Sequence, residues 1–156
     1  MSNSRRVVLV RHGETRWSAT GRHTGRTDID LTDGGAAQAR LVPSLVAPLG
    51  LSNPLVLSSP RRRATDTARI AGLQVDRVDD RLAEWDYGDY EGITTAEIRR
   101  TVPGWTVWTH PCPGGESTDD VTERADDLLR DLMADPPAVP GASASDVILI
   151  GHGHLS

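Results

Sequence analysis

Three short apolar runs along the chain predict buried strands. Residues 7–10 (VVLV), 54–59 (PLVLSS) and 147–150 (VILI) have the pattern of parallel strands that are covered on both faces. Residues 75–78 (VDRV) predict a fourth, shorter strand.

Helical patterns lie between these strands, and local end signals support them. Thr32 is a predicted N-cap, Pro60 suits a first helical position, and Thr94 begins a segment with capping-box spacing. The predicted helices cover residues 33–46, 60–72, 94–103 and 117–132, and the proline-rich residues 135–145 predict a loop. Because strands and helices alternate, we expect an α/β fold, a three-layer sandwich in which helices cover both faces of a mostly parallel sheet.

Length and composition narrow the class of protein. The chain of 156 residues suits a single domain over residues 1–156, and its net charge of −5 argues against nucleic-acid and membrane partners. One cysteine, Cys112, excludes an internal disulfide, and the spacing of the five histidines fixes no metal, so we expect neither metal nor cofactor. No run approaches a membrane span or a signal-peptide core, which predicts a cytoplasmic protein.

Cationic residues and histidines follow three of the predicted strands. These motifs are residues 11–13 (RHG), 61–63 (RRR) and 151–153 (GHG). Ligands of open parallel sheets bind beyond the carboxyl ends of the strands. All 17 basic residues are arginine, whose guanidinium matches a phosphate bidentately, and a histidine held among them can attack phosphorus. Each motif alone is typical of a surface loop, but together they predict a phosphate site.

Five motifs, taken in order, resemble those of the histidine phosphatase superfamily. They are RHGETRW, GRHTGRTDIDLTDGG, SSPRRRATDTA, LAEWDYGDYEG and GHG. The resemblance covers essentially the whole chain and is strongest to the small acid-phosphatase-type branch. It implies a phosphoglycerate-mutase-like form of the expected sandwich.

The resemblance implies three catalytic roles. His12 matches the nucleophile that carries the phosphoryl group, and His152 matches the second histidine, which binds the phosphoryl oxygens in its protonated form. Glu84 matches the general acid, which protonates the leaving oxygen and then accepts a proton from the attacking water. Because Glu84 must begin protonated, we expect an acidic pH optimum.

The resemblance also implies residues that bind the substrate. Arg11 matches the first phosphate clamp, and Arg63, directly before the Ala-x-x-Thr-Ala segment, matches the second. The two arginines before Arg63 are the alternates if the register differs. Thr24 and Gly25 match a loop that touches the phosphate in the mutases. Catalysis of phosphoryl transfer depends largely on such positioning and charge.

These roles imply a phosphomonoester hydrolase that acts on a phosphorylated small molecule through a phosphohistidine. The alternative, a cofactor-dependent phosphoglycerate mutase, must hold a second anionic group. Residues 84–116 contain six carboxylates and only two arginines. This charge balance disfavours the binding of a second anionic group and therefore favours the hydrolase. Five of the six aromatic residues lie in the same segment, where we expect them to pack a lid onto the sheet rather than to hold an aromatic leaving group.

An alternative of another class is a phosphate-binding or regulatory module without turnover. Ser18 stands where the family usually has asparagine, and the chain ends at Ser156, where family members continue for several tens of residues. We therefore expect a domain that lacks the family's C-terminal portion. An exposed sheet edge tends to pair with another chain, so this form is expected to be less stable or to associate, with a homo-oligomer as one outcome.

Overall fold

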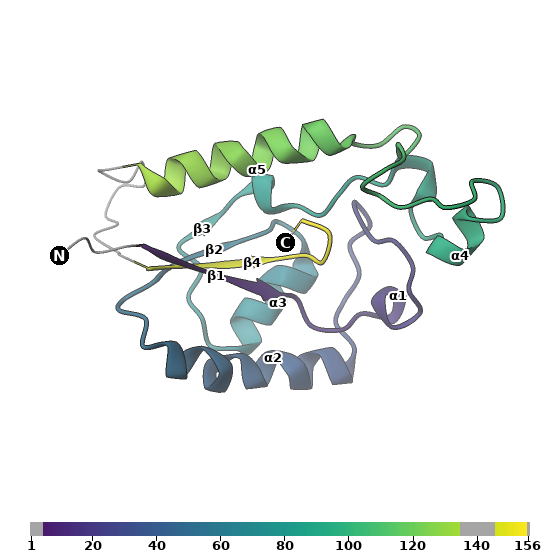
Figure 1. The fold of residues 1–156 in the computed structure, drawn as a ribbon. Helices are drawn as coiled ribbons and strands as arrows, with labels where there is room; N and C mark the ends of the chain where they lie inside the picture. Colours follow the sequence, from purple (N-terminus) through teal and green to yellow (C-terminus); the bar gives the residue numbers. More distant parts are fainter. Residues whose placement is uncertain (1–4, 135–145, 156) are drawn as a thin grey trace.

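The computed structural model describes residues 5–134 and 146–155 and confirms the three-layer architecture (Figure 1). Four parallel strands form one sheet in the order β1-β4-β2-β3. Helices α2 and α3 cover one face and α5 covers the other. The strands are β1 (Arg6–Arg11), β2 (Leu55–Ser58), β3 (Arg77–Val78) and β4 (Asp146–Gly151).

The helix α2 (Asp33–Val46) has the predicted bounds, whereas α3 (Arg62–Ile70) begins later than predicted. Thr32 caps α2 by accepting a hydrogen bond from the Gly35 N–H. The predicted helix start at Pro60 is wrong, because Arg61 still has extended backbone and is the N-cap. The Ser59 N–H donates to the Ile150 carbonyl, so pairing with β4 continues one residue past β2 and delays the helix.

Two further helices begin at the predicted caps. Thr94 and Glu97 form the capping box of α4 (Thr95–Ile98), which ends well before residue 103, and Ser117 and Asp120 form that of α5 (Thr118–Met133). The remaining helical segments are α1 (Arg16–Ala19), η1 (Ala47–Leu49), η2 (Asp80–Leu82) and η3 (Gly88–Tyr90). The predicted loop at residues 135–145 lies outside the described residues.

The core consists of one apolar cluster on each face of the sheet and a third within the lid, residues 84–116, where the lid meets α5. Leu57 and Leu149 pack with Leu128 and Leu132 of α5 on one face. Small α3 residues allow that helix to approach the other face closely. The third cluster contains Trp85, Tyr87, Ile98, Trp105, Val107, Cys112 and Val121. Three of the five lid aromatics are therefore buried, but in a cluster without strand residues, and Tyr87 also lines the cavity described below.

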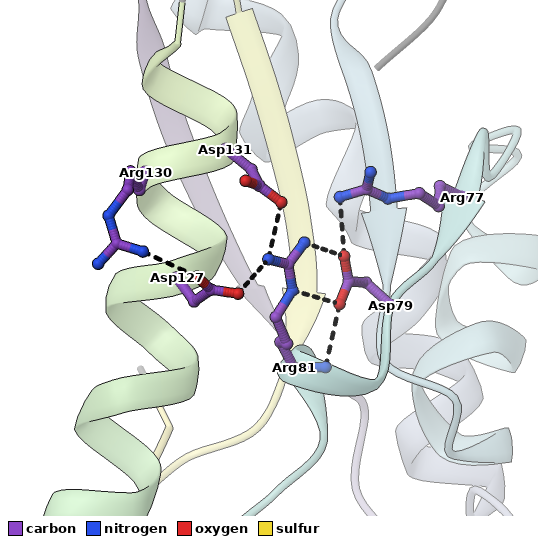
Figure 2. A network of polar contacts seen from close by, with 6 residues as sticks. All are labelled: Arg77, Asp79, Arg81, Asp127, Arg130 and Asp131. Carbon is purple, nitrogen blue, oxygen red and sulfur yellow. Dashed lines mark hydrogen bonds and ion pairs between the residues drawn. The ribbon is translucent and has the colours of Figure 1, made fainter. Parts of the chain in front are cut away.

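A polar network ties the segment before Glu84 to α5 (Figure 2). Arg81, the middle residue of the short η2 helix, contacts both oxygens of Asp79 at 3.0 and 2.9 Å. It also reaches across to Asp127 at 3.0 Å and Asp131 at 2.8 Å on α5. The network therefore holds residues 79–81, which follow β3, against α5.

The strand β1 lies at one edge of the sheet. Among the described strands it pairs with β4 alone, and Leu9 at its centre is 56% exposed. The expected self-association through such an edge stays a prediction. No helix within the described residues is long and apolar enough to cross a membrane.

Candidate active site

The carboxyl ends of β1, β4 and β2 meet at one edge of the sheet and bring the three sequence motifs together. Arg11 at the end of β1 lies opposite Gly151 at the end of β4, and Ser58 at the end of β2 lies opposite Ile150. The His12 N–H then donates to the Gly151 carbonyl at 3.1 Å. The register alone therefore places the residues that follow each strand at one rim, as predicted.

His12 and His152 face each other at this rim. Their ring centroids are 5.1 Å apart, with the ring planes inclined by 61°. His12 Nδ1 lies 2.7 Å from the Gly13 carbonyl oxygen. A carbonyl oxygen only accepts, so Nδ1 carries the proton and Nε2 keeps its lone pair. His12 thus has the tautomer that a nucleophile needs.

Burial and nearby cations keep both imidazoles neutral. Burial, followed by the charges of Arg63 and Arg11, lowers the pKa of His12 to about 4. Burial, followed by Arg63 and His12, lowers the pKa of His152 to about 2. His152 is therefore neutral in the anion-free site, and its protonation while it holds phosphoryl oxygens stays a prediction. A bound phosphate dianion would favour the protonated form and oppose this shift.

Arg63, in the first turn of α3, is completely buried beside these rings. Its Nη1 donates to the Thr27 carbonyl at 3.0 Å, and its Nη2 donates to the carbonyls of Thr24 at 2.8 Å and Gly25 at 3.3 Å. The Nε atom has no hydrogen-bond partner among the described residues. The loop thus orients the guanidinium through Nη1 and Nη2 and does not engage Nε. Burial lowers the pKa of Arg63, and the Glu84 carboxylate opposes this effect.

Thr24 and Gly25 lie in the loop that orients Arg63. Thr24 also lines the cavity beside His12. The Gly25 N–H donates to both carboxylate oxygens of Glu91 at 3.0 Å, so it is already engaged. A Cβ atom on Gly25 would lie 2.3 Å from the Trp85 carbonyl oxygen, so only glycine permits this close contact with the acid loop.

The Arg11 side chain lies against Gly153, the last residue of the GHG motif. A Cβ atom on Gly153 would lie 3.2 Å from the Arg11 guanidinium carbon, which shows that the guanidinium rests on this glycine. Unlike Arg63, Arg11 is exposed. The two arginines therefore approach the histidines from different sides, one from solvent and one from the core.

Glu84 belongs to the same site. It is 8% exposed and lines a cavity of about 230 Å³ beside His12. One carboxylate oxygen accepts from the Trp85 N–H at 2.9 Å and the other from the His154 N–H at 3.2 Å. The cavity lining comprises Arg11, His12, Ser18, Gly21, Arg22, His23, Thr24, Glu84, Tyr87, Thr95, Gly153 and His154.

The charges of this cavity differ from those of the surrounding segment. Of the six carboxylates between residues 84 and 116, all in the described part of the chain, Glu84 alone lines the cavity. Arg11 and Arg22 line it as well. The carboxylate count in the sequence therefore overstates the negative charge near the phosphate site, and it does not discriminate a hydrolase from a mutase.

Sequence reasoning missed three residues that form the outer wall of the cavity. The Tyr87 hydroxyl and His154 Nδ1 are 2.6 Å apart, and the His23 ring lies 4.7 Å from Tyr87 and 5.9 Å from His154. The sequence offered a clue to His154, because residues 153–154 repeat the Gly-His pair of residues 151–152. His23 and Tyr87 meet only through the tertiary fold. No group of histidine, cysteine and acidic side chains within the described residues has the arrangement of a metal site.

Comparison with known proteins gives one consistent result. Residues 7–156 match the family model of the histidine phosphatase superfamily (branch 1). An acid phosphatase of Mycobacterium tuberculosis is 51% identical over 151 residues, which span 97% of this chain and 71% of that protein. A glucosyl-3-phosphoglycerate phosphatase of the same species is 39% identical over 163 residues, with 97% and 72% coverage.

The solved structures agree. A protein encoded by an open reading frame of M. tuberculosis superposes with a TM-score of 0.86 at 50% identity, covering 97% of this chain and 75% of that one. Phosphoglycerate mutases also match, at lower identity than the acid phosphatase. The fold and the order of motifs are thus those of the matched family.

Proposed function

This chain belongs to branch 1 of the histidine phosphatase superfamily, and on that premise we propose that it hydrolyses phosphate monoesters through a phosphohistidine on His12. One observation carries the proposal. The neutral His12 ring, with Nε2 unprotonated, lies 5.1 Å from the His152 ring and beside the buried cation Arg63. A nucleophile, two kinds of phosphate ligand and a carboxylate then share one site.

In the first step the phosphoryl group moves to His12. The Nε2 lone pair forms the N–P bond while the bond from phosphorus to the ester oxygen breaks. Arg11, Arg63 and His152 hold the phosphoryl oxygens, on which negative charge develops. Glu84 gives its proton to the departing oxygen, so the product leaves as an alcohol.

In the second step water attacks the same phosphorus atom from the vacated side. Glu84, now a carboxylate, accepts a proton from that water as the new P–O bond forms. The N–P bond breaks, and its electron pair returns to His12 Nε2. Nδ1 keeps its proton and its hydrogen bond to the Gly13 carbonyl throughout, so the ring regains its original state and orientation without a proton transfer.

We favour hydrolysis over the mutase reaction, because the two phosphatases named above match 97% of this chain at 51% and 39% identity, whereas a mutase that matches 95% of it is 34% identical. Purified protein is therefore expected to release phosphate from 3-phosphoglycerate or an aryl phosphate faster than it forms 2-phosphoglycerate, with both products measured in the same reaction. Faster interconversion would establish a mutase. Release of less than one equivalent of phosphate per protein would favour a binding module without turnover.

The lowered pKa of His12 gives a prediction about pH. Burial and the two arginines disfavour the imidazolium, so His12 stays neutral from neutral pH down to about pH 4. In an NMR titration, the histidine signal that is absent from His12→Asn should stay constant from pH 8 to pH 5 and then move near pH 4. A nucleophile with this pKa is compatible with an acidic optimum. A transition of that signal near pH 6.5 would contradict the proposed environment.

The substrate is expected to be a phosphorylated small molecule. A cavity of about 230 Å³ leaves room beside the phosphate for a leaving group of limited size. Its outer wall of imidazole and phenol rings supplies hydrogen-bonding edges as well as apolar surface. The cavity thus favours a compact polar leaving group.

A further inference from the structure

Behind the loop that carries Glu84, Arg124 of α5 and Glu116 form an ion pair with two contacts. Arg124 Nε lies 2.8 Å from Glu116 Oε1, and Nη2 lies 3.0 Å from Oε2. The two side chains are only 16% and 25% exposed. Neither is among the described residues that line the cavity beside His12. The pair therefore lies outside the cavity wall, although the charge of Arg124 is near enough to contribute to the lowered pKa of His152.

We propose that this pair is a clamp that positions Glu84 for proton transfer, an inference that rests on the function proposed above. Arg124 holds the backbone on the near side of the acid. Its Nη1 donates to the carbonyls of Arg81 at 2.7 Å and Ala83 at 2.8 Å. The second of these carbonyls belongs to the residue directly before Glu84.

Glu116 holds the backbone on the other side. Its Oε2 accepts from the Asp86 N–H at 2.8 Å, and its own N–H donates to the Asp86 carbonyl at 2.8 Å. Its carbonyl accepts from the Trp85 indole N–H at 3.0 Å. One ion pair thus fixes the chain immediately before and immediately after Glu84.

The position of this loop matters because Glu84 has little else to orient it. Within the described residues, its carboxylate accepts hydrogen bonds from two backbone N–H groups, and one of them, from Trp85, belongs to the loop itself. A general acid must lie within hydrogen-bond reach of the leaving oxygen. A displacement of about 1 Å in such a group can lower the rate by about 10²-fold. Loss of one partner would also leave the other charge partly buried and unpaired.

The fold offers a reason why loss of the clamp should stay local. The network of Figure 2 already anchors Asp79 and Arg81 to α5 through Asp127 and Asp131. The segment therefore remains attached to the helix when Arg124 is removed. What changes is the precision with which Ala83, directly before the acid, and Trp85 and Asp86, directly after it, are held.

The test compares two esters that differ in their need for a proton. The p-nitrophenolate of p-nitrophenyl phosphate leaves as a stable anion, whereas the alkoxide of β-glycerol phosphate requires protonation. For Arg124→Met we expect kcat/KM to fall about 10²-fold on the alkyl ester and less than about 3-fold on the aryl ester. We use kcat/KM because it reports the transfer to His12, not the later hydrolysis.

Two further variants complete the design. Glu116→Gln should give the same selective loss and replaces Arg124→Met if that variant does not fold. Arg130→Met is the matched control, because Arg130 is on the same helix, is 71% exposed and pairs with Asp127 one turn away. It should leave both esters unaffected.

An equal loss on both esters, or no loss on either, would overturn the clamp, because each result separates the pair from proton transfer. Failure of the proposed function is a different result. In that case the natural protein itself would release no phosphate from either ester. A wrong clamp leaves the natural activity intact and removes only the selective effect of the variants.

Discussion

His12→Ala is expected to lower kcat/KM for an aryl phosphate by about 10⁴-fold or more, because removal of the nucleophile leaves the remaining groups without a covalent route. The fold should survive, since His12 is only half-buried and lies after β1 rather than within it. Steady-state kinetics together with a thermal melt would separate loss of chemistry from loss of structure.

His110→Ala is the control for this variant. His110 lies in the lid segment beside the Thr109 hydroxyl, 2.9 Å away, and does not line the cavity in the described part of the chain. Its replacement should change kcat/KM by less than about 2-fold, as for most surface substitutions. If His12→Ala keeps more than a tenth of the natural activity, the nucleophile is another group.

Arg63→Met is expected to lower kcat/KM by about 10³-fold, the scale on which a single well-placed cation acts in phosphoryl transfer. Methionine keeps most of the length of the side chain but has no donors. It cannot bind the phosphate, and it cannot bridge the carbonyls of Thr24, Gly25 and Thr27 that now orient the guanidinium. Kinetics and urea unfolding measured in parallel would report both effects.

The adjacent residue supplies the control for Arg63. Arg62 is one position earlier on α3, is 63% exposed and forms a surface ion pair with Asp30 at 3.1 Å. Arg62→Met should lose at most about 1 kcal/mol of stability and little activity. If Arg62→Met is the more damaging of the two, the phosphate clamp lies in the other register.

Local sequence signals predicted the start of a helix correctly where no tertiary contact competes with the signal. Thr32, Thr94 and Ser117 act as N-caps as expected, because a cap satisfies N–H groups of its own helix. The start of α3 was missed because pairing of Ser59 with β4 overrides the proline signal at Pro60. The four-residue α1 was missed inside a long polar loop, where hydrophobic periodicity has no length over which to appear.

The order and direction of the strands made part of the active site predictable from the sequence. Residues that follow parallel strands meet at one sheet edge, so His12 and His152 could be paired before any coordinates existed. The family resemblance, rather than spacing, selected Glu84. Sequence patterns could not predict the contacts around Glu84. Arg124 contacts residues 81 and 83, and Glu116 contacts residues 85 and 86, and these segments meet only in the tertiary structure.

The central claim is that the phosphoryl group is bonded to His12 during turnover. The most direct measurement mixes the protein with a ³²P-labelled monoester, stops the reaction within milliseconds in base, which preserves phosphohistidine, and maps the label by peptide analysis. We predict label on the peptide that contains His12, lost in His12→Ala and accumulated to a higher level in Glu84→Gln with an aryl ester. Label on another residue, or equal label in His12→Ala, would contradict the account.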